Sequence, residues 1–205
     1  EFQSELNDSK FTYGIDYSKV DTSRLRTTKT MGGSTDVAKD TPDTDITRTG
    51  VYLQNEFSKG KFDFISGLRY DSYELDAKPD DYVSSSAAFD LDADKLSPKF
   101  AVTYNINEDL STYAQYSQGF RAPAYYEVNA NFSNPMRGYT TKSNPDLKPE
   151  TSDSYEVGLR GRYSQIDFDV SGFYNKYDNF IEQLVNTGAV SYTHLEPTRP
   201  RLISY

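Results

Sequence analysis

Few side chains in this 205-residue chain have the chemistry of a catalytic or metal site. The sequence contains no cysteine, which excludes a disulfide framework, a thiolate metal site and cysteine catalysis. Its one histidine, His194, argues against a Ser/His/Asp triad and a histidine-rich metal site. The acidic run Asp90–Asp94 copies the start of an EF-hand loop, but Lys95 and Ala101 replace the glycine and glutamate that calcium requires. We therefore predict no enzyme and no bound metal, with weak calcium binding that also involves Asp80 and Asp81 as a minor alternative.

The candidate ligand-binding residues gather around one long polar segment, Gly119–Glu150. Two short boxes flank it: Phe120, Arg121, Ala122 and Pro123 before it, and Asn144, Pro145, Asp146 and Leu147 near its end. Between the boxes, the Arg137 guanidinium could pair with an anionic ligand, and Tyr125, Tyr126 and Tyr139 could bind iron through a phenolate. For each tyrosine, an aromatic contact within the loop is the simpler interpretation. Because proline removes backbone donors and fixes φ, the boxes could instead serve mainly to shape the loop.

Composition narrows the class of partner. The formal net charge of −9 argues against a nucleic-acid partner, whose binding depends on neutralising phosphates. No apolar stretch approaches the roughly 20 residues of a membrane-spanning helix. Mean hydropathy is −0.76, as low as in many disordered chains, yet the sequence has 18 tyrosines and 12 phenylalanines. Disordered chains are poor in aromatic residues, so these rings must lie on a surface that accommodates them.

Alternation of apolar and polar residues with period two runs through most of the chain. This pattern predicts β-strands. The segments with the clearest alternation are 11–18, 61–70, 99–106, 154–163 and 166–175, and less regular strands lie at 2–6, 49–57 and 110–118. No segment has a convincing helical period. The sequence predicts an all-β chain with about eight antiparallel strands.

The connections between these strands alternate strictly in length. Short polar turns are predicted near residues 7–10, 58–60, 107–109 and 164–165. Long polar segments lie between them, at Asp21–Ile46, Asp71–Ser97 and Gly119–Glu150. All long loops must then emerge at one end of the sheet and all tight turns at the other, an organisation typical of outer-membrane β-barrels. A soluble β-sandwich would explain the strands but not this asymmetry.

The strand number also bears on closure. Eight strands can close a barrel, but the first residues carry neither a signal peptide nor a complete start, so we expect a slice of a larger barrel. A slice has two unpaired strand edges, which lipid cannot satisfy, and we expect it to be poorly stable alone.

The region Tyr113–Arg162 resembles a known family. The run from Tyr113 through Phe120-Arg121-Ala122-Pro123, the piece Asn134-Pro135-Met136-Arg137-Gly138-Tyr139 and the box Asn144-Pro145-Asp146-Leu147 are similar to the C-terminal half of the barrel of TonB-dependent outer-membrane receptors. The paired boxes particularly resemble those of haem and haemoglobin receptors. The resemblance covers most of residues 10–185, and siderophore receptors carry related boxes.

The resemblance implies a function and a set of partners. It implies a partial transmembrane barrel, of roughly 22 strands when complete, in the outer membrane of a Gram-negative bacterium, surrounded by lipid. It implies import of an iron-containing ligand, with haem or a haem-carrier protein favoured, and coupling to TonB through an N-terminal plug that this sequence does not include. Haem would be transported cargo and not a cofactor. A siderophore receptor and a non-transporting surface barrel or adhesin stay open as alternatives.

Two features depart from the expected pattern. Haem receptors of this type carry a histidine ligand between the boxes, whereas residues 124–143 contain none. The alternation of apolar and polar residues also ends near Gly188, and Pro197 and Pro200 would interrupt a central strand. We therefore predict a barrel region over residues 1–188 and a non-barrel tail over 189–205. Our hypothesis is that this tail is an artefact of sequence assembly or reading frame.

Overall fold

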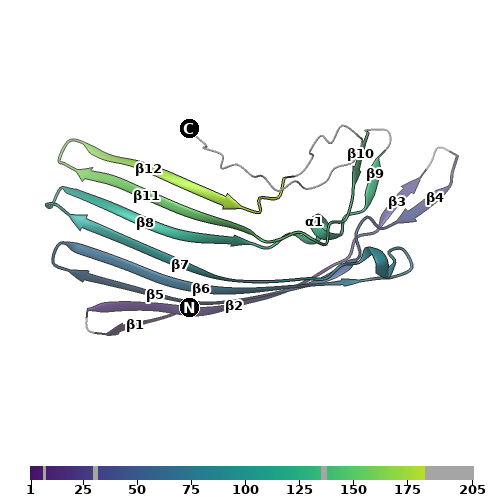
Figure 1. The fold of residues 1–205 in the computed structure, drawn as a ribbon, viewed down its shortest axis with the longest axis horizontal. Coiled ribbons are helices and arrows are strands. Elements are labelled where there is room, and N and C mark those ends of the chain that lie inside the picture. The colour runs from purple at the N-terminus through teal and green to yellow at the C-terminus, as the bar shows by residue number, and fades with distance from the viewer. Residues whose placement is uncertain (7, 30–31, 135–137, 183–205) are drawn as a thin grey trace.

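Eight antiparallel strands form one continuous curved sheet (Figure 1). The computed structural model describes residues 1–6, 8–29, 32–134 and 138–182. The strands in sheet order are β1 (Phe2–Leu6), β2 (Ser9–Thr22), β5 (Asp43–Lys59), β6 (Phe62–Lys78), β7 (Leu91–Asn105), β8 (Leu110–Arg121), β11 (Glu150–Arg162) and β12 (Asp167–Asp178). Within the described residues β1 and β12 do not pair, so the sheet stays open. The predicted all-β fold, an eight-stranded part of a barrel, is confirmed.

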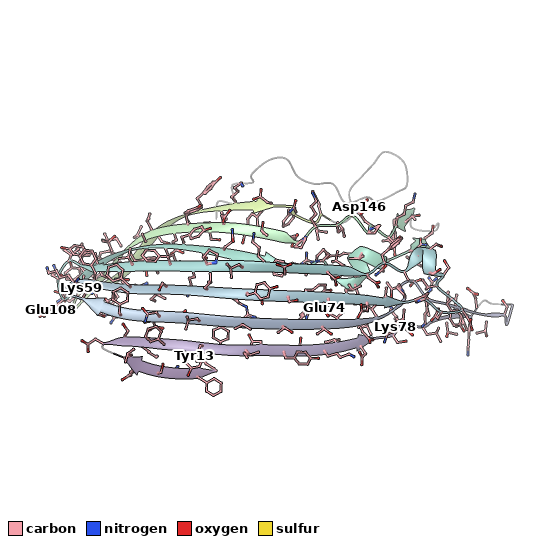
Figure 2. All side chains as sticks on the ribbon, turned by 60° about the horizontal axis from the view of Figure 1, so that its bottom comes forward. Tyr13, Lys59, Glu74, Lys78, Glu108 and Asp146 are labelled. Carbon is pink, nitrogen blue, oxygen red and sulfur yellow. The ribbon has the colours of Figure 1, made fainter. Side chains whose placement is uncertain are left out.

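The connections divide between the two ends of the sheet as the sequence predicts. Figure 2 shows Lys59 and Glu108 at the end with tight turns, where Gly60 adopts a φ of +64°, and Lys78 and Asp146 toward the other end. We call that other end the loop end. It carries loop A (residues 23–42), loop B (79–90) and loop C (122–149). Loop A contains β3 (Arg26–Lys29) and β4 (Thr35–Ala38), and loop C contains β9 (Phe132–Asn134) and β10 (Tyr139–Thr141).

The bounds predicted for the first two long loops are wrong. Loops were predicted at 21–46 and 71–97, but β5 begins at Asp43, β6 continues to Lys78 and β7 begins at Leu91. Pairs such as Asp45 with Asp76 extend the ladder well beyond the last apolar alternation. In these extensions the apolar side chains of Ile46, Tyr73 and Leu75 face inward under loop C, and the outer face carries polar residues such as Asp45. The apolar alternation of the outer face has therefore ended there, although hydrogen bonding of the backbone continues.

Two short helical segments interrupt the loops. They are the α-helix α1 (Tyr125–Asn129) in loop C and the 3₁₀ turn η1 (Ser85–Ala87) in loop B. A helix of five residues is too short to show a period in the sequence, which is why neither was predicted. Among the described residues, no helix has the length and apolar content needed to cross a membrane.

The register of the ladder separates apolar from polar side chains. Tyr13, Leu53 and Leu68 occupy one rung and share what we call the outer face. Outer-face apolar side chains are strongly exposed, with Ile15 71% and Val157 61% accessible. The inner face instead carries ion pairs, such as the one between Arg160 and Asp169. This division matches a barrel whose outside contacts lipid and whose inside contacts water.

The small apolar core lies on the inner face at the loop end. Ile46 on β5 and Tyr73 and Leu75 on β6 are at most 5% exposed and form its centre. Ala77, Leu91, Ala93, Ala122 and Tyr125 pack around them. The last two come from loop C, so this loop folds inward onto the sheet and does not extend away from it.

Candidate binding site at the loop end of the sheet

The first box ends a strand and starts loop C. Phe120 and Arg121 are the last residues of β8, and Pro123 is almost fully buried where the chain turns inward. Helix α1 then begins after Ala124, whose backbone N–H donates to Glu127 Oε2 at 2.8 Å. The box therefore directs the chain from the barrel wall to the inner face.

An ion-pair clasp holds the two limbs of loop C together. Arg121 Nη2 lies 2.7 Å from Glu127 Oε1, and Arg121 Nη1 lies 2.7 Å from Glu150 Oε2. The Glu127 side chain is only 3% exposed, and Glu150 also accepts a hydrogen bond from the Ile181 backbone N–H. Since Arg121 and Glu150 are also a register pair of β8 and β11, the clasp closes the loop at its base.

The second box forms the returning limb. The Asn144 side chain accepts a hydrogen bond from the Asp146 backbone N–H at 3.2 Å, and the Asn144 N–H donates to the Val128 carbonyl of α1. Pro145 and Asp146 are exposed and Leu147 is half-buried. These hydrogen bonds fix the turn at Asn144 and join the returning limb to α1.

Hydrogen bonds and ion pairs join the three loops. The Asn129 side chain on α1 is 1% exposed, and it both donates to and accepts from the Phe89 backbone of loop B at 2.8 Å. The Asn131 N–H donates to the Asp40 carbonyl of loop A. Arg26 pairs with Asp40 and stacks on Phe132, with 4.6 Å between its guanidinium carbon and the ring centroid. The loops thus form one assembly.

A buried lysine links loops A and B. Lys39 has a side chain only 7% exposed and pairs with Asp43, at the start of β5, and with Asp80 of loop B. These hydrogen bonds raise the pKa of Lys39 and lower the pKa of both carboxyls. The backbone N–H groups of Tyr82 and Val83 lower the pKa of Asp80 further. All three groups are held in their charged forms at neutral pH.

The predicted loop tyrosines do not converge on one point. Tyr125 packs on the core and Tyr126 is 46% exposed, with their rings edge to face at 5.4 Å. Tyr139 lies in the β9–β10 hairpin against Phe132. Arg137 lies outside the described residues, as do His194 and the predicted tail, 189–205. Within the described part of the chain, no group of three acidic or histidine side chains is placed to hold a metal ion.

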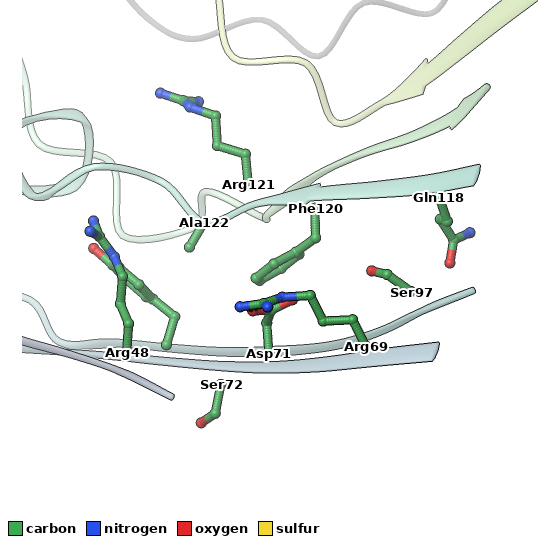
Figure 3. A pocket seen from close by; sticks show the side chains of 10 residues that line it. Arg48, Arg69, Asp71, Ser72, Ser97, Gln118, Phe120, Arg121 and Ala122 are labelled. Carbon is green, nitrogen blue, oxygen red and sulfur yellow. Dashed lines mark hydrogen bonds and ion pairs between the residues drawn. The ribbon is translucent and has the colours of Figure 1, made fainter. Parts of the chain in front are cut away.

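A cavity lies on the inner face beneath the loop assembly. Its volume is about 420 Å³, and its lining includes Arg48, Arg69, Tyr73, Ser97, Phe120 and Arg121 (Figure 3). Arg69 is held by Asp16 and Asp71 at 2.8 Å, in space that a side chain at position 50 would fill, because a Cβ on Gly50 would lie 2.2 Å from Arg69 Nη2. Cavities of this volume accommodate small molecules.

Several of these residues were not predicted from the sequence. Glu127 shows only half of the capping-box signature, because Ala124 occupies the N-cap position where Ser or Thr would be expected. The links of Asn129 to Phe89 and of Lys39 to Asp80 give no local signal, since these partners are 40 and 41 residues away. Arg48 and Tyr73 reach the cavity only because the strands continue past their alternating segments.

The architecture defines a class of protein. An antiparallel sheet with an apolar outer face, a polar inner face and all long loops at one end is the arrangement of a transmembrane β-barrel. Residues 1–199 match the family model described as TonB dependent receptor-like, beta-barrel. The chain belongs to this family, whose members are receptors and transporters.

Individual relatives agree with this assignment. The chain is 30% identical to the hemin receptor of Yersinia pestis over 199 residues, which are 89% of this chain and 27% of that protein. It is 32% identical to hemoglobin-haptoglobin utilization protein B of Neisseria meningitidis serogroup C over 158 residues, 72% of this chain and 19% of that protein. The chain thus spans about a quarter or less of the length of these curated relatives.

A solved structure shows the same fold. The hemophore receptor HasR of Serratia marcescens, determined as a double mutant in complex with its hemophore HasA and heme, superposes with a TM-score of 0.71 at 21% identity. The superposition covers 96% of this chain and 35% of the receptor chain.

Proposed function

We propose that this chain is part of an outer-membrane receptor that imports haem, taken up free or from a haem-carrier protein. The observation that carries the proposal is the similarity, over most of the chain, to a hemin receptor and to a hemoglobin-haptoglobin utilization protein. The geometry supports it, since three interlocked loops cover a cavity on the inner face of the sheet. Haem in this proposal is transported cargo.

The proposal includes a location and an energy source. The exposed apolar side chains of the outer face would contact the lipid of the outer membrane of a Gram-negative bacterium. The polar inner face would contact water and a plug domain, through which the TonB complex would supply energy for transport. The loop end would face the outside of the cell, where a ligand or a carrier protein arrives.

A siderophore is the second candidate for the cargo. The observation that favours it is the absence of histidine from residues 124–143, between the two boxes. Haem bound there would lack an imidazole ligand from this loop, whereas an iron carrier that supplies its own ligands needs none. The two candidates differ in whether the protein must ligate iron.

Growth on defined iron sources tests the proposal. The intact receptor that contains this chain is expressed in a bacterium that has TonB but lacks its own haem receptors, with haem or haemoglobin as sole iron source. We expect growth that disappears when tonB is deleted. Growth on a ferric siderophore but not on haem would support the second candidate. Growth that does not require tonB would contradict both.

A further inference from the structure

Three arginines line the cavity on the inner face, and Arg48 differs from the other two in its ion pairing. Arg69 is paired with Asp16 and Asp71, and Arg121 with Glu127 and Glu150. Arg48 takes part in none of the ion pairs formed among the residues the structure describes. Its guanidinium carbon lies 5.4 Å from the centroid of the Tyr73 ring. The charge of Arg48 is thus available to a bound anion.

Tyr73 supplies a second donor beside Arg48. Its side chain is 3% exposed, and its hydroxyl makes no hydrogen bond of standard geometry within the described residues. The Arg48 guanidinium is near enough to donate to the hydroxyl oxygen, which leaves the O–H itself without an acceptor. A buried O–H without an acceptor is unfavourable, so an acceptor arriving from a ligand would remove that cost. Arg48 cannot be that acceptor, because a guanidinium only donates.

The two donors define the chemistry of the missing partner. A group that accepts from a guanidinium and from a phenol must carry lone pairs, and a negative charge would make both hydrogen bonds stronger. A carboxylate fits the planar fork of a guanidinium through two parallel hydrogen bonds. Figure 3 shows Arg48 beside Ala122, with Phe120 further along the cavity. A ligand whose carboxylate binds at Arg48 would therefore place its apolar part against Ala122 and Phe120.

We propose that Arg48 and the Tyr73 hydroxyl bind a carboxylate of the imported ligand. This inference rests on the proposed function, and for haem the carboxylate is a propionate. Position 48 is a partner of position 73 in the β5–β6 ladder, so both donors are fixed by the barrel wall and not by a loop. The site therefore exists before the ligand arrives.

The test compares two porphyrins in the intact receptor that contains this chain. Haem and its dimethyl ester, which lacks free carboxylates, are titrated into purified receptor and followed by their visible spectra. We expect Arg48→Ala to weaken haem binding roughly tenfold to a hundredfold and Tyr73→Phe several-fold, with little change for the ester. Arg24→Ala, which removes an exposed arginine from loop A, should leave both affinities unchanged.

The outcomes separate this inference from the proposed function. Equal losses for haem and ester in Arg48→Ala, or no loss for haem, would overturn the carboxylate site while haem import stands. If the unmodified receptor binds neither porphyrin, haem import fails, and ferric citrate becomes the probe for the same variants. Stabilisation by ferric citrate that Arg48→Ala abolishes would then support the site, whereas its absence in the unmodified receptor would overturn it.

Discussion

Arg121 and Glu150 are 29 residues apart in sequence, yet the guanidinium of one lies 2.7 Å from the carboxylate of the other across neighbouring strands. Loop C leaves the sheet just after Arg121 and returns just before Glu150. The same guanidinium holds Glu127 of α1, which is nearly fully buried. One arginine therefore connects the departure of the loop, its return and the helix between them.

Replacing Arg121 should release loop C without unfolding the barrel. Arg121→Ala leaves the buried Glu127 carboxylate without its cation, and the cost should be about 2 kcal/mol, between the values for exposed and fully buried pairs. That cost falls on the loop, because the β8–β11 ladder keeps its backbone pairing. Hydrogen exchange should become faster throughout α1 and remain unchanged in the middle of β8.

A double variant tests whether this effect comes from the ion pair. Arg121→Ala combined with Glu127→Gln removes the cation together with the buried charge, so part of the lost protection in α1 should return. Protection that is identical in the single and the double variant would show that the clasp does not hold the helix.

The Asn129 side chain should determine how firmly loops B and C are joined. Asn129→Ala leaves the N–H and carbonyl of Phe89 without their partners, at a cost of about 1–3 kcal/mol. We expect faster exchange of the Phe89 amide and faster proteolysis within loop B. Asn131→Ala is the matched control, because Asn131 contacts Asp40 through its backbone and should retain that bond. Equal proteolysis of the two variants would contradict this account.

The fold was predictable from the sequence because the membrane imposes a pattern on it. Tyr13, Leu53 and Leu68 share a rung and a face, and each belongs to a segment with period-two alternation. The apolar alternation of the outer face ends before the strands do. The extensions of β5 toward Asp43 and of β6 toward Lys78 were not predicted for this reason. Backbone pairing continues in them without the side-chain alternation that marks a strand in the sequence.

The site was less predictable, because its contacts cross between loops. The two boxes mark where loop C leaves and returns, but proline and asparagine indicate only a turn. Asn129 of loop C bonds to Phe89 of loop B, and Lys39 of loop A pairs with Asp80 of loop B. In the sequence, Arg48 is one of several polar residues in a polar stretch, and only the pairing of the strands shows that it lies beside Tyr73. Such long-range pairs follow from register and loop packing, which one sequence does not specify.

The contact between loops A and B should hold only within a pH window. The pKa values of Asp43 and Asp80 lie below the ordinary 3.8, so their contribution to stability is present above that pH and is lost as the pH falls through the lowered values. The pKa of Lys39 lies above the ordinary 10.5, so its contribution is present below that pH and is lost as the pH rises through the raised value. Limited proteolysis of both loops should accelerate outside this window.

A variant at position 39 checks this pH dependence. Lys39→Met removes the cation that lowers both carboxyl pKa values, so proteolysis of the loops at neutral pH should rise and its acid dependence should weaken. Lys148→Met, at an exposed lysine of loop C, should retain the profile of the unmodified protein. If proteolysis of Lys39→Met still accelerates at acid pH as in the unmodified protein, carboxyl groups other than Asp43 and Asp80 determine the acid stability of the loops.

Two strand glycines should respond very differently to alanine. A Cβ on Gly158 would lie 2.4 Å from the ring of Tyr113, which is fixed by a 2.6 Å hydrogen bond to Glu156 and by the guanidinium of Arg160 over its face. Gly158→Ala should therefore destabilise the barrel by about 1–3 kcal/mol. A Cβ on Gly172 would meet nothing within 4 Å, so Gly172→Ala should be neutral or slightly stabilising. Thermal unfolding of the intact receptor in detergent micelles, followed by circular dichroism, would distinguish them; equal midpoints would contradict the close approach of Tyr113.

The strongest test of the membrane assignment places the same charge on opposite faces of one strand. Leu53 on the outer face of β5 is 51% exposed, whereas the adjacent Gln54 points inward and donates to Glu56. An arginine at position 53 would enter the hydrocarbon and should cost about 2–4 kcal/mol near the bilayer midplane. At position 54 it would face water and a carboxylate, so its cost should be small. Denaturant unfolding of the intact receptor in lipid vesicles would measure both. Equal destabilisation by Leu53→Arg and Gln54→Arg would mean that the outer face contacts something other than lipid, because only a hydrocarbon environment penalises one face and spares the other.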